Sequence, residues 1–217
     1  MSATDVLPVA AGIAVPAGLL CAAEDLAALA WFHEAERSLA LIAALHEGGF
    51  PCGLGVLPAD APALLRFAAA VADVAGVRPD DAPGLADELA ADFAAIYLTH
   101  ALRASPCESV WRDEDHLMLQ GSVFDVRARY QAHGVVARNW RLLPDDHLSN
   151  ELAFVAHLLG CAQADAAAHF LDAHLLVWLP DFAERVASRA ATRFYATLAD
   201  VTLAAVRAVR ERLETGR

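Results

Sequence analysis

The chain has 217 residues, 57% of them apolar, and carries a formal net charge of −12. This length suits one sizeable domain, and no Gly/Ser/Pro-rich linker divides the sequence into two. The negative charge argues against nucleic acid and anionic membrane surfaces as partners, because both are bound through clustered Lys and Arg side chains. A basic peptide is a more natural partner for such a chain.

The N-terminal stretch Val6–Ala23 has no charged side chain and is interrupted by prolines and glycines. A secretory signal needs a positive segment before its apolar run, whereas Asp5 is the only charge there. We therefore predict that residues 1–21 form a flexible or surface-packed arm and that residues 22–217 form one helical domain. A signal or membrane segment is the alternative.

Apolar residues recur mostly at helical spacing, which predicts an all-α fold. The predicted helices span about 22–46, 59–75, 84–102, 113–133, 145–160, 164–179 and 181–212, the last with a bend near Ser188. Glycine and proline mark most of their ends. We expect a single compact bundle of six to eight helices.

The four cysteines are widely spaced and form no CxxC pair: Cys21, Cys52, Cys107 and Cys161. This spacing is typical of small apolar residues in a reducing cytoplasm, with zinc binding as the less favoured alternative. We expect the protein to be cytoplasmic.

Patterns for catalysis and metal binding are weak in this sequence. Three groups of histidines and acids could suggest a metal: His33, Glu34 and Glu36; Asp113, Asp115 and His116; Asp165, His169 and His174. None has the spacing of HExxH, and the sequence has neither a GxSxG elbow nor a phosphate-binding GK[ST] loop. We expect no enzymatic activity, no metal and no cofactor, and a metal-dependent hydrolase is the least favoured alternative.

The segment Pro144–Leu152 is the most informative local pattern. Its proline and two aspartates precede an apolar run, as at the start of a helix. His147 would then lie near the positive end of the helix dipole, which favours the neutral imidazole. An ordinary helix cap beside a surface histidine is the alternative interpretation.

Several segments in order resemble one known family. They are Pro106-x-Glu108-Ser109-Val110-Trp111, Tyr130-x-x-x-Gly134, Pro144-x-Asp146-His147-Leu148-x-x-Glu151-Leu152-x-Phe154, and Phe170-Leu171-x-x-His174-Leu175-x-x-Trp178. At these spacings, roughly from Leu85 to Leu203, the chain resembles the TorD/DmsD (NarJ-like) family of redox-enzyme maturation chaperones. Leu143 departs from the pattern, because the family often has a glutamate there.

This resemblance implies a cytoplasmic, all-helical chaperone that binds the twin-arginine signal peptide of a molybdenum-containing oxidoreductase subunit. Such a chaperone delays export until the cofactor has been inserted. The resemblance places recognition at Pro144, Asp146 and His147, with Glu108, Ser109 and Trp111 beside them; Asp145 and Trp140 join by proximity. The identity of the client, the choice between a monomer and a domain-swapped dimer, and nucleotide or molybdenum cofactor binding stay open. A helical interaction or regulatory domain without chaperone activity is the main alternative.

Overall fold

A computed structural model describes residues 15–216, except 100 and 102. The predicted arm therefore lies largely outside the described residues, and the first helix begins at Ala17. The described helices are α1 Ala17–Glu34, α2 Leu39–Glu47, α3 Pro62–Ala75, α4 Ala82–Phe93, α5 Glu108–Arg112, α6 Gly121–Ala132, α7 Leu148–Gly160, α8 Ala164–Phe170, α9 Leu176–Arg189 and α10 Arg193–Thr215. Two π-helical turns, η1 Ala94–Leu98 and η2 Leu171–Leu175, follow α4 and α8. The all-α prediction is confirmed.

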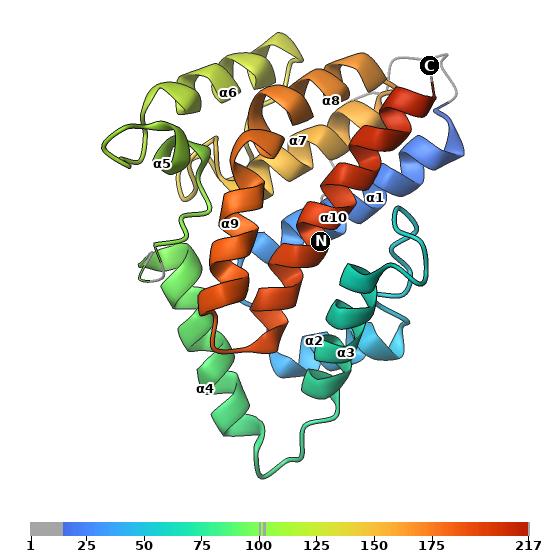
Figure 1. Ribbon diagram of the computed structural model, residues 1–217, viewed down its shortest axis with the longest axis vertical. Helices are drawn as coiled ribbons and strands as arrows, with labels where there is room; N and C mark the ends of the chain where they lie inside the picture. The colour runs from blue at the N-terminus through green and yellow to red at the C-terminus, as the bar shows by residue number, and fades with distance from the viewer. Residues whose placement is uncertain (1–14, 100, 102, 217) are drawn as a thin grey trace, which may run out of the picture.

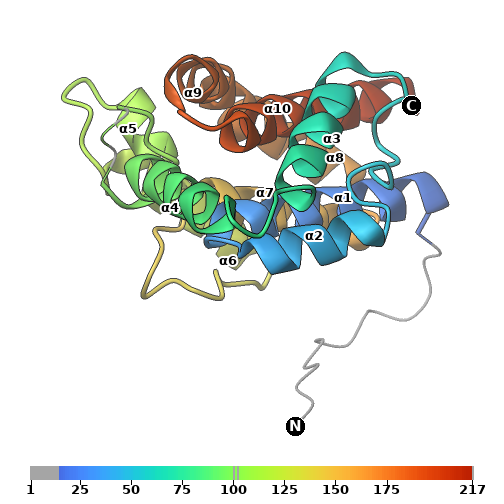
Figure 2. The same ribbon diagram turned by 90° about the horizontal axis from the view of Figure 1, so that it is seen from below.

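The helices form two layers around one apolar core (Figures 1 and 2). α9, α10 and α3 lie in one layer, while α1, α2, α4 and α6 lie in the other (Figure 2). α1 and α7 pack along each other, and α10 contacts α9, α3 and α1. Trp178, Phe67 and Phe182 are the largest side chains that this core buries completely. Among the described helices, none combines the length and the apolar character that crossing a membrane requires.

Several predicted helix boundaries were wrong. The helix predicted over 22–46 is two helices, α1 and α2, because the chain is extended at Ala35 and Ser38 caps α2 by accepting the N–H of Leu41. The helix predicted from 113 starts only at Gly121. Pro180 does not close a helix but lies inside α9, which continues to Arg189. The stretch predicted over 181–212 is therefore divided between α9 and α10, which begins at Arg193.

A buried histidine joins three elements of the core. The Tyr97 hydroxyl in η1 lies 2.6 Å from Nδ1 of His33 in α1, and the Thr202 hydroxyl in α10 lies 2.9 Å from its Nε2. Because Thr202 donates its own proton to the Leu198 carbonyl, its oxygen accepts from Nε2–H, and Nδ1 accepts from Tyr97. His33 is thus a neutral core residue with both nitrogens occupied, rather than a surface group beside Glu34 and Glu36.

Candidate functional site

The segment before α5 pairs with the segment before α7. Cys107 and His147 form an isolated antiparallel bridge. The Glu108 N–H donates to the Asp146 carbonyl over 3.0 Å, and the Leu148 N–H donates to the Pro106 carbonyl over 2.7 Å. This short ladder brings the two family-like motifs together, although 37 residues separate Ser109 from Asp146. Both helices therefore start where residues 106–109 pair with residues 146–148, and we call this paired region the joint.

Asp146 and His147 are buried in this joint, with 0% and 2% exposure. Asp146 Oδ2 accepts the Ser109 N–H over 2.7 Å and so caps the start of α5. Burial raises the pKa of Asp146, while hydrogen bonds from Ser109 oppose that rise. His147 is the N-cap of α7, and its Nδ1 accepts the Ser149 N–H over 3.2 Å. The helix therefore begins at Leu148, slightly later than predicted.

A buried pair of carboxyl groups lies behind the joint. The Glu108 carboxylate accepts from Arg112 over 2.5 Å and from Nδ1–H of His174 over 2.9 Å. Glu151 Oε2 accepts from the indole N–H of Trp178 over 3.2 Å. Both glutamates have 0% exposure.

The two carboxyl groups share one negative charge. Burial, and then the charge of Glu108, raise the pKa of Glu151 well above its usual value. Burial alone would also raise the pKa of Glu108, but hydrogen bonds from His174, Glu151 and Arg112 outweigh it and lower that pKa. Glu108 is therefore the ionised partner and Glu151 the neutral one. Sequence reasoning selected Glu108 only, although Glu151 and His174 both occur in the family-like segments.

Of the remaining candidate residues, Asp145 is buried, with 5% exposure, whereas Trp111 and Trp140 lie nearer the surface. Asp145 accepts from Arg127 over 2.7 Å, and its carbonyl accepts from the Tyr130 hydroxyl over 2.9 Å. Trp111 is partly buried and donates its indole N–H to the Ser105 carbonyl over 2.8 Å. Trp140 is 59% exposed. The candidate set thus divides into interior residues of the joint and aromatic side chains at its edge.

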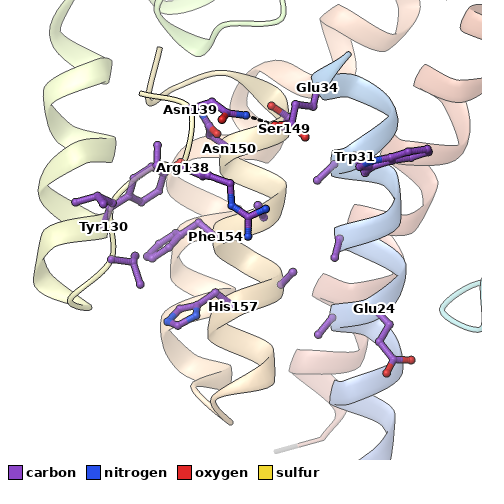
Figure 3. Close-up of a pocket in the computed structure, with 18 residues that line it drawn as sticks. Glu24, Trp31, Glu34, Tyr130, Arg138, Asn139, Ser149, Asn150, Phe154 and His157 are labelled. Atoms are coloured by element: carbon purple, nitrogen blue, oxygen red, sulfur yellow. Dashed lines mark hydrogen bonds between the residues drawn. The ribbon is translucent and has the colours of Figure 1, made fainter. Parts of the chain in front are cut away.

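A groove of about 630 Å³ lies beside this joint (Figure 3). It runs between α1 and α7 and is flanked by the end of α6 and the loop that follows. Its lining residues are Ala23, Glu24, Ala27, Ala30, Trp31, Glu34, Tyr130, Val135, Val136, Ala137, Arg138, Asn139, Ser149, Asn150, Ala153, Phe154, Ala156 and His157. Small side chains at helical spacing on α1 and α7 leave the seam between the two helices hollow.

The groove is mostly apolar, with charged groups at its edges. Glu24 and Glu34 lie ten positions apart on α1, and Arg138 reaches in from the opposite loop (Figure 3). The Asn139 amide donates to the Glu34 carboxylate and ties that loop to α1. Asn150 donates to the Pro144 carbonyl over 2.8 Å, which connects the groove to the joint. Sequence reasoning missed this groove because its walls come from segments more than 100 residues apart.

The histidine and acid groups considered for metal binding are dispersed. In the described part of the chain, no group of three or more His, Cys, Asp or Glu side chains is placed to hold a metal ion. Nδ1–H of His174 donates to Glu108 over 2.9 Å. The four cysteines are free thiols, and burial raises the pKa of Cys107 well above its usual value.

Comparison with known proteins identifies the family. The family described as nitrate reductase delta subunit matches residues 57–184. The chaperone protein TorD of Vibrio cholerae serotype O1 is 35% identical over 130 residues, which cover 54% of this chain and 58% of that protein. TorD of a Shewanella species is 33% identical over 165 residues, covering 69% and 75%. TorD of Actinobacillus pleuropneumoniae serotype 7 is 32% identical over 196 residues, covering 85% and 94%.

The share of each relative that the match covers differs. The match spans little more than half of the Vibrio protein and nearly all of the Actinobacillus protein. These relatives carry the name of a chaperone. The matched region contains the joint and α7, where the family-like motifs were found. The chain therefore belongs to the TorD/NarJ-like family.

Proposed function

We propose that this protein is a cytoplasmic chaperone for the maturation of a molybdenum-containing oxidoreductase subunit. It binds the twin-arginine signal peptide of that subunit, or its apo form, and delays export until the cofactor is inserted. Family membership and the TorD relatives support the chaperone class. The net charge of −12 suits a client segment with a basic end.

The observation that carries this proposal is the apolar groove between α1 and α7. Its floor of alanines with Trp31 and Phe154 matches the apolar middle of a signal peptide. Glu24 and Glu34 at the α1 edge suit positive charge on the same peptide. The client's apolar segment lies along this seam in our proposal.

The relative size of the two contributions assigns their roles. Burying on the order of 400 Å² of apolar peptide surface contributes about 10 kcal/mol before the cost of ordering a flexible peptide. An exposed pair between an arginine and a carboxylate contributes only about 0–1 kcal/mol. Apolar contact therefore sets the affinity, while charge sets the encounter rate and the register of the peptide.

The candidate residues take two roles in this proposal. Asp146, His147, Glu108 and Ser109 act as positioning residues, since they are buried where α5 and α7 begin. Together with Asp145, they hold in place the start of α7, and α7 forms one wall of the groove. Trp140, Trp111 and Pro144 are the members of the set with exposed or partly exposed surface, and these contact the client.

The test is a peptide titration with one groove variant and one matched control. Ala27 is exposed in the groove on α1, so Ala27→Arg adds bulk and charge without disturbing the core. Ala69 is equally exposed on α3, away from the groove, and Ala69→Arg is the control. Because Trp31 lines the groove, tryptophan fluorescence and calorimetry both report binding.

We expect Ala27→Arg to weaken binding of a twin-arginine leader by about tenfold or more, because it displaces apolar contacts. Ala69→Arg should leave the affinity within about twofold. Equal affinity of both variants and the wild type would place the peptide elsewhere. Absence of any leader binding by the wild type would favour a helical interaction domain of another kind.

A further inference from the structure

A second surface lies at the other end of α6 and has not been used so far. The loop 113–120 and the first turns of α6 carry four acidic side chains: Asp113, Glu114, Asp115 and Asp125. The same stretch exposes four large apolar side chains: Leu117, Met118, Leu119 and Phe124. We call the first set the acidic face and the second set the apolar ridge. Large apolar side chains gathered on a surface mark a site of interaction.

The backbone of this loop is held in a strained form that exposes the ridge. His116 and Leu119 have positive φ angles of 55° and 62°, a region that non-glycine residues rarely adopt because the side chain is crowded there. The Asp113 carboxylate fixes the loop by accepting the N–H groups of Asp115 and Leu117 over 3.1 and 3.0 Å. Leu119 is 59% exposed in this conformation. The ridge is therefore preorganised rather than collapsed onto the core.

A small polar pocket of about 200 Å³ lies between this loop and α6. Its lining residues are Ser109, Arg112, Asp113, Gln120, Gly121, Ser122 and Asp125. Ser122 is 8% exposed, and its hydroxyl oxygen is buried without a hydrogen-bond partner among the described residues. A buried hydroxyl without a partner lowers the stability of the protein, so a ligand that bonds to it recovers that free energy.

The charges around the pocket select the kind of ligand. Asp113 and Asp125 line it, and Glu114 and Asp115 follow Asp113 in the same loop. The only cation in the lining, Arg112, is already neutralised by Glu108 at 2.5 Å. An anion at the start of α6 would meet these carboxylates, whereas a cationic donor would be attracted by them.

We propose that this pocket binds the guanidinium group of an arginine in the client's leader and that the apolar ridge holds a large apolar side chain beside it. The planar guanidinium has several N–H donors, so it reaches the Ser122 hydroxyl and a carboxylate together, which a lysine ammonium does less well. This inference rests on the proposed function and adds to it a separate subsite for the basic end of the peptide.

The pocket and the groove lie close enough together for one peptide to reach both. α6 lines both sites, through Ser122 at its start and Tyr130 near its end. The rise along the helix between these residues is about 12 Å, which about four extended residues span. A leader with arginines followed after a short spacer by an apolar segment can therefore occupy both sites at once.

The experiment uses the full chain and two designed peptides with blocked ends. The short peptide contains two adjacent arginines and two leucines; the long one adds a spacer and an apolar segment of about ten residues. Each is also made with glutamine in place of arginine. The pocket variants are Ser122→Val and Asp125→Asn. Asp87→Asn, at an exposed position on α4, is the matched charge control.

We expect Ser122→Val and Asp125→Asn each to weaken the short arginine peptide about 3- to 20-fold and to leave its glutamine form unchanged. Asp87→Asn should change neither affinity by more than about twofold. Circular dichroism and thermal unfolding establish that all variants stay folded. An arginine peptide that binds Ser122→Val and Asp125→Asn as tightly as the wild type overturns the inference.

Other outcomes separate this inference from the groove proposal. If Ala27→Arg leaves the long peptide unaffected while the pocket variants weaken both arginine peptides, the groove proposal fails and the pocket stands. If Ala27→Arg weakens the long peptide and the pocket variants change nothing, the pocket fails alone. Inorganic sulfate that competes with the short peptide only when Ser122 is present would identify an anion site and also overturn the inference.

Discussion

The buried histidine of the core makes stability depend on pH in a predictable way. Burial, and then the charge of His147, lower the pKa of His33 from 6.5 to about 3. In the unfolded chain the imidazole binds a proton below about pH 6.5, whereas in the folded chain it stays neutral down to about pH 3. This contribution to stability is therefore complete above pH 6.5 and is lost progressively as the pH falls towards 3.

The magnitude follows from linkage. Between pH 7.5 and pH 5.0 the unfolded state takes up most of one proton at this site, which lowers the free energy of unfolding by about 2 kcal/mol. His33→Gln removes the titrating group and keeps a donor and an acceptor towards Tyr97 and Thr202. We expect the variant to be less stable at pH 7.5 by about 1–3 kcal/mol, because the amide cannot reproduce both hydrogen bonds.

The assay is urea unfolding, followed by far-ultraviolet circular dichroism, at pH 7.5, 6.0 and 5.0. The stability of His33→Gln should fall less than that of the wild type by about 2 kcal/mol over this range. His46→Gln, at an exposed position on α2, is the control and should follow the wild type. Parallel pH curves for wild type and His33→Gln would mean that His33 is protonated inside the fold and would refute the reasoning.

Three further predictions concern the joint. The raised pKa of Glu151 makes the wild type lose stability as the pH rises above about 4.5. Glu151→Gln lacks this titration, so it should gain stability relative to the wild type by up to about 1.4 kcal/mol per pH unit. Urea unfolding at pH 5 and pH 8 measures this difference. Glu108→Gln should instead lose about 2–4 kcal/mol of stability at pH 7, because His174 and Arg112 lose their carboxylate partner. A loss of stability no larger than that of Glu151→Gln would contradict the assigned charges. Asp146→Ala should lose about 1–3 kcal/mol, because it leaves the Ser109 N–H without its acceptor, and faster amide exchange at Ser109 would be the specific sign.

Local sequence patterns were sufficient for the class of fold and for many helices. Apolar residues at helical spacing identified both ends of α3 and α7, and the C-terminal end of α10, to within a few residues, because each helix buries one continuous face. The break between α1 and α2 was missed, although the polar stretch between them contains Ser38, which caps α2 by accepting the Leu41 N–H. The start of α6 was missed because acidic residues at 113–115 resemble a helix start but serve the loop instead.

The roles of the candidate residues depended on contacts that no local pattern contains. Asp146 and His147 were correctly placed at a helix start from Pro144–Leu152, but their burial follows from pairing with 106–108. The charge states of Glu108 and Glu151 follow from the exclusion of water by α7, η2 and α9, which is a property of the packed core.

The sequence by itself determined the helical class, the negative charge and the motifs that connect this chain to its family, because spacing and composition are local properties. Tertiary structure decided which of those residues reach the surface. It placed Asp146 and His147 in the interior as helix caps, and it formed the groove from α1 and α7. It also buried the Ser122 hydroxyl without a partner beside a pocket that Asp113 and Asp125 line. The physical reason is that burial and cavity shape depend on side chains brought together from distant segments.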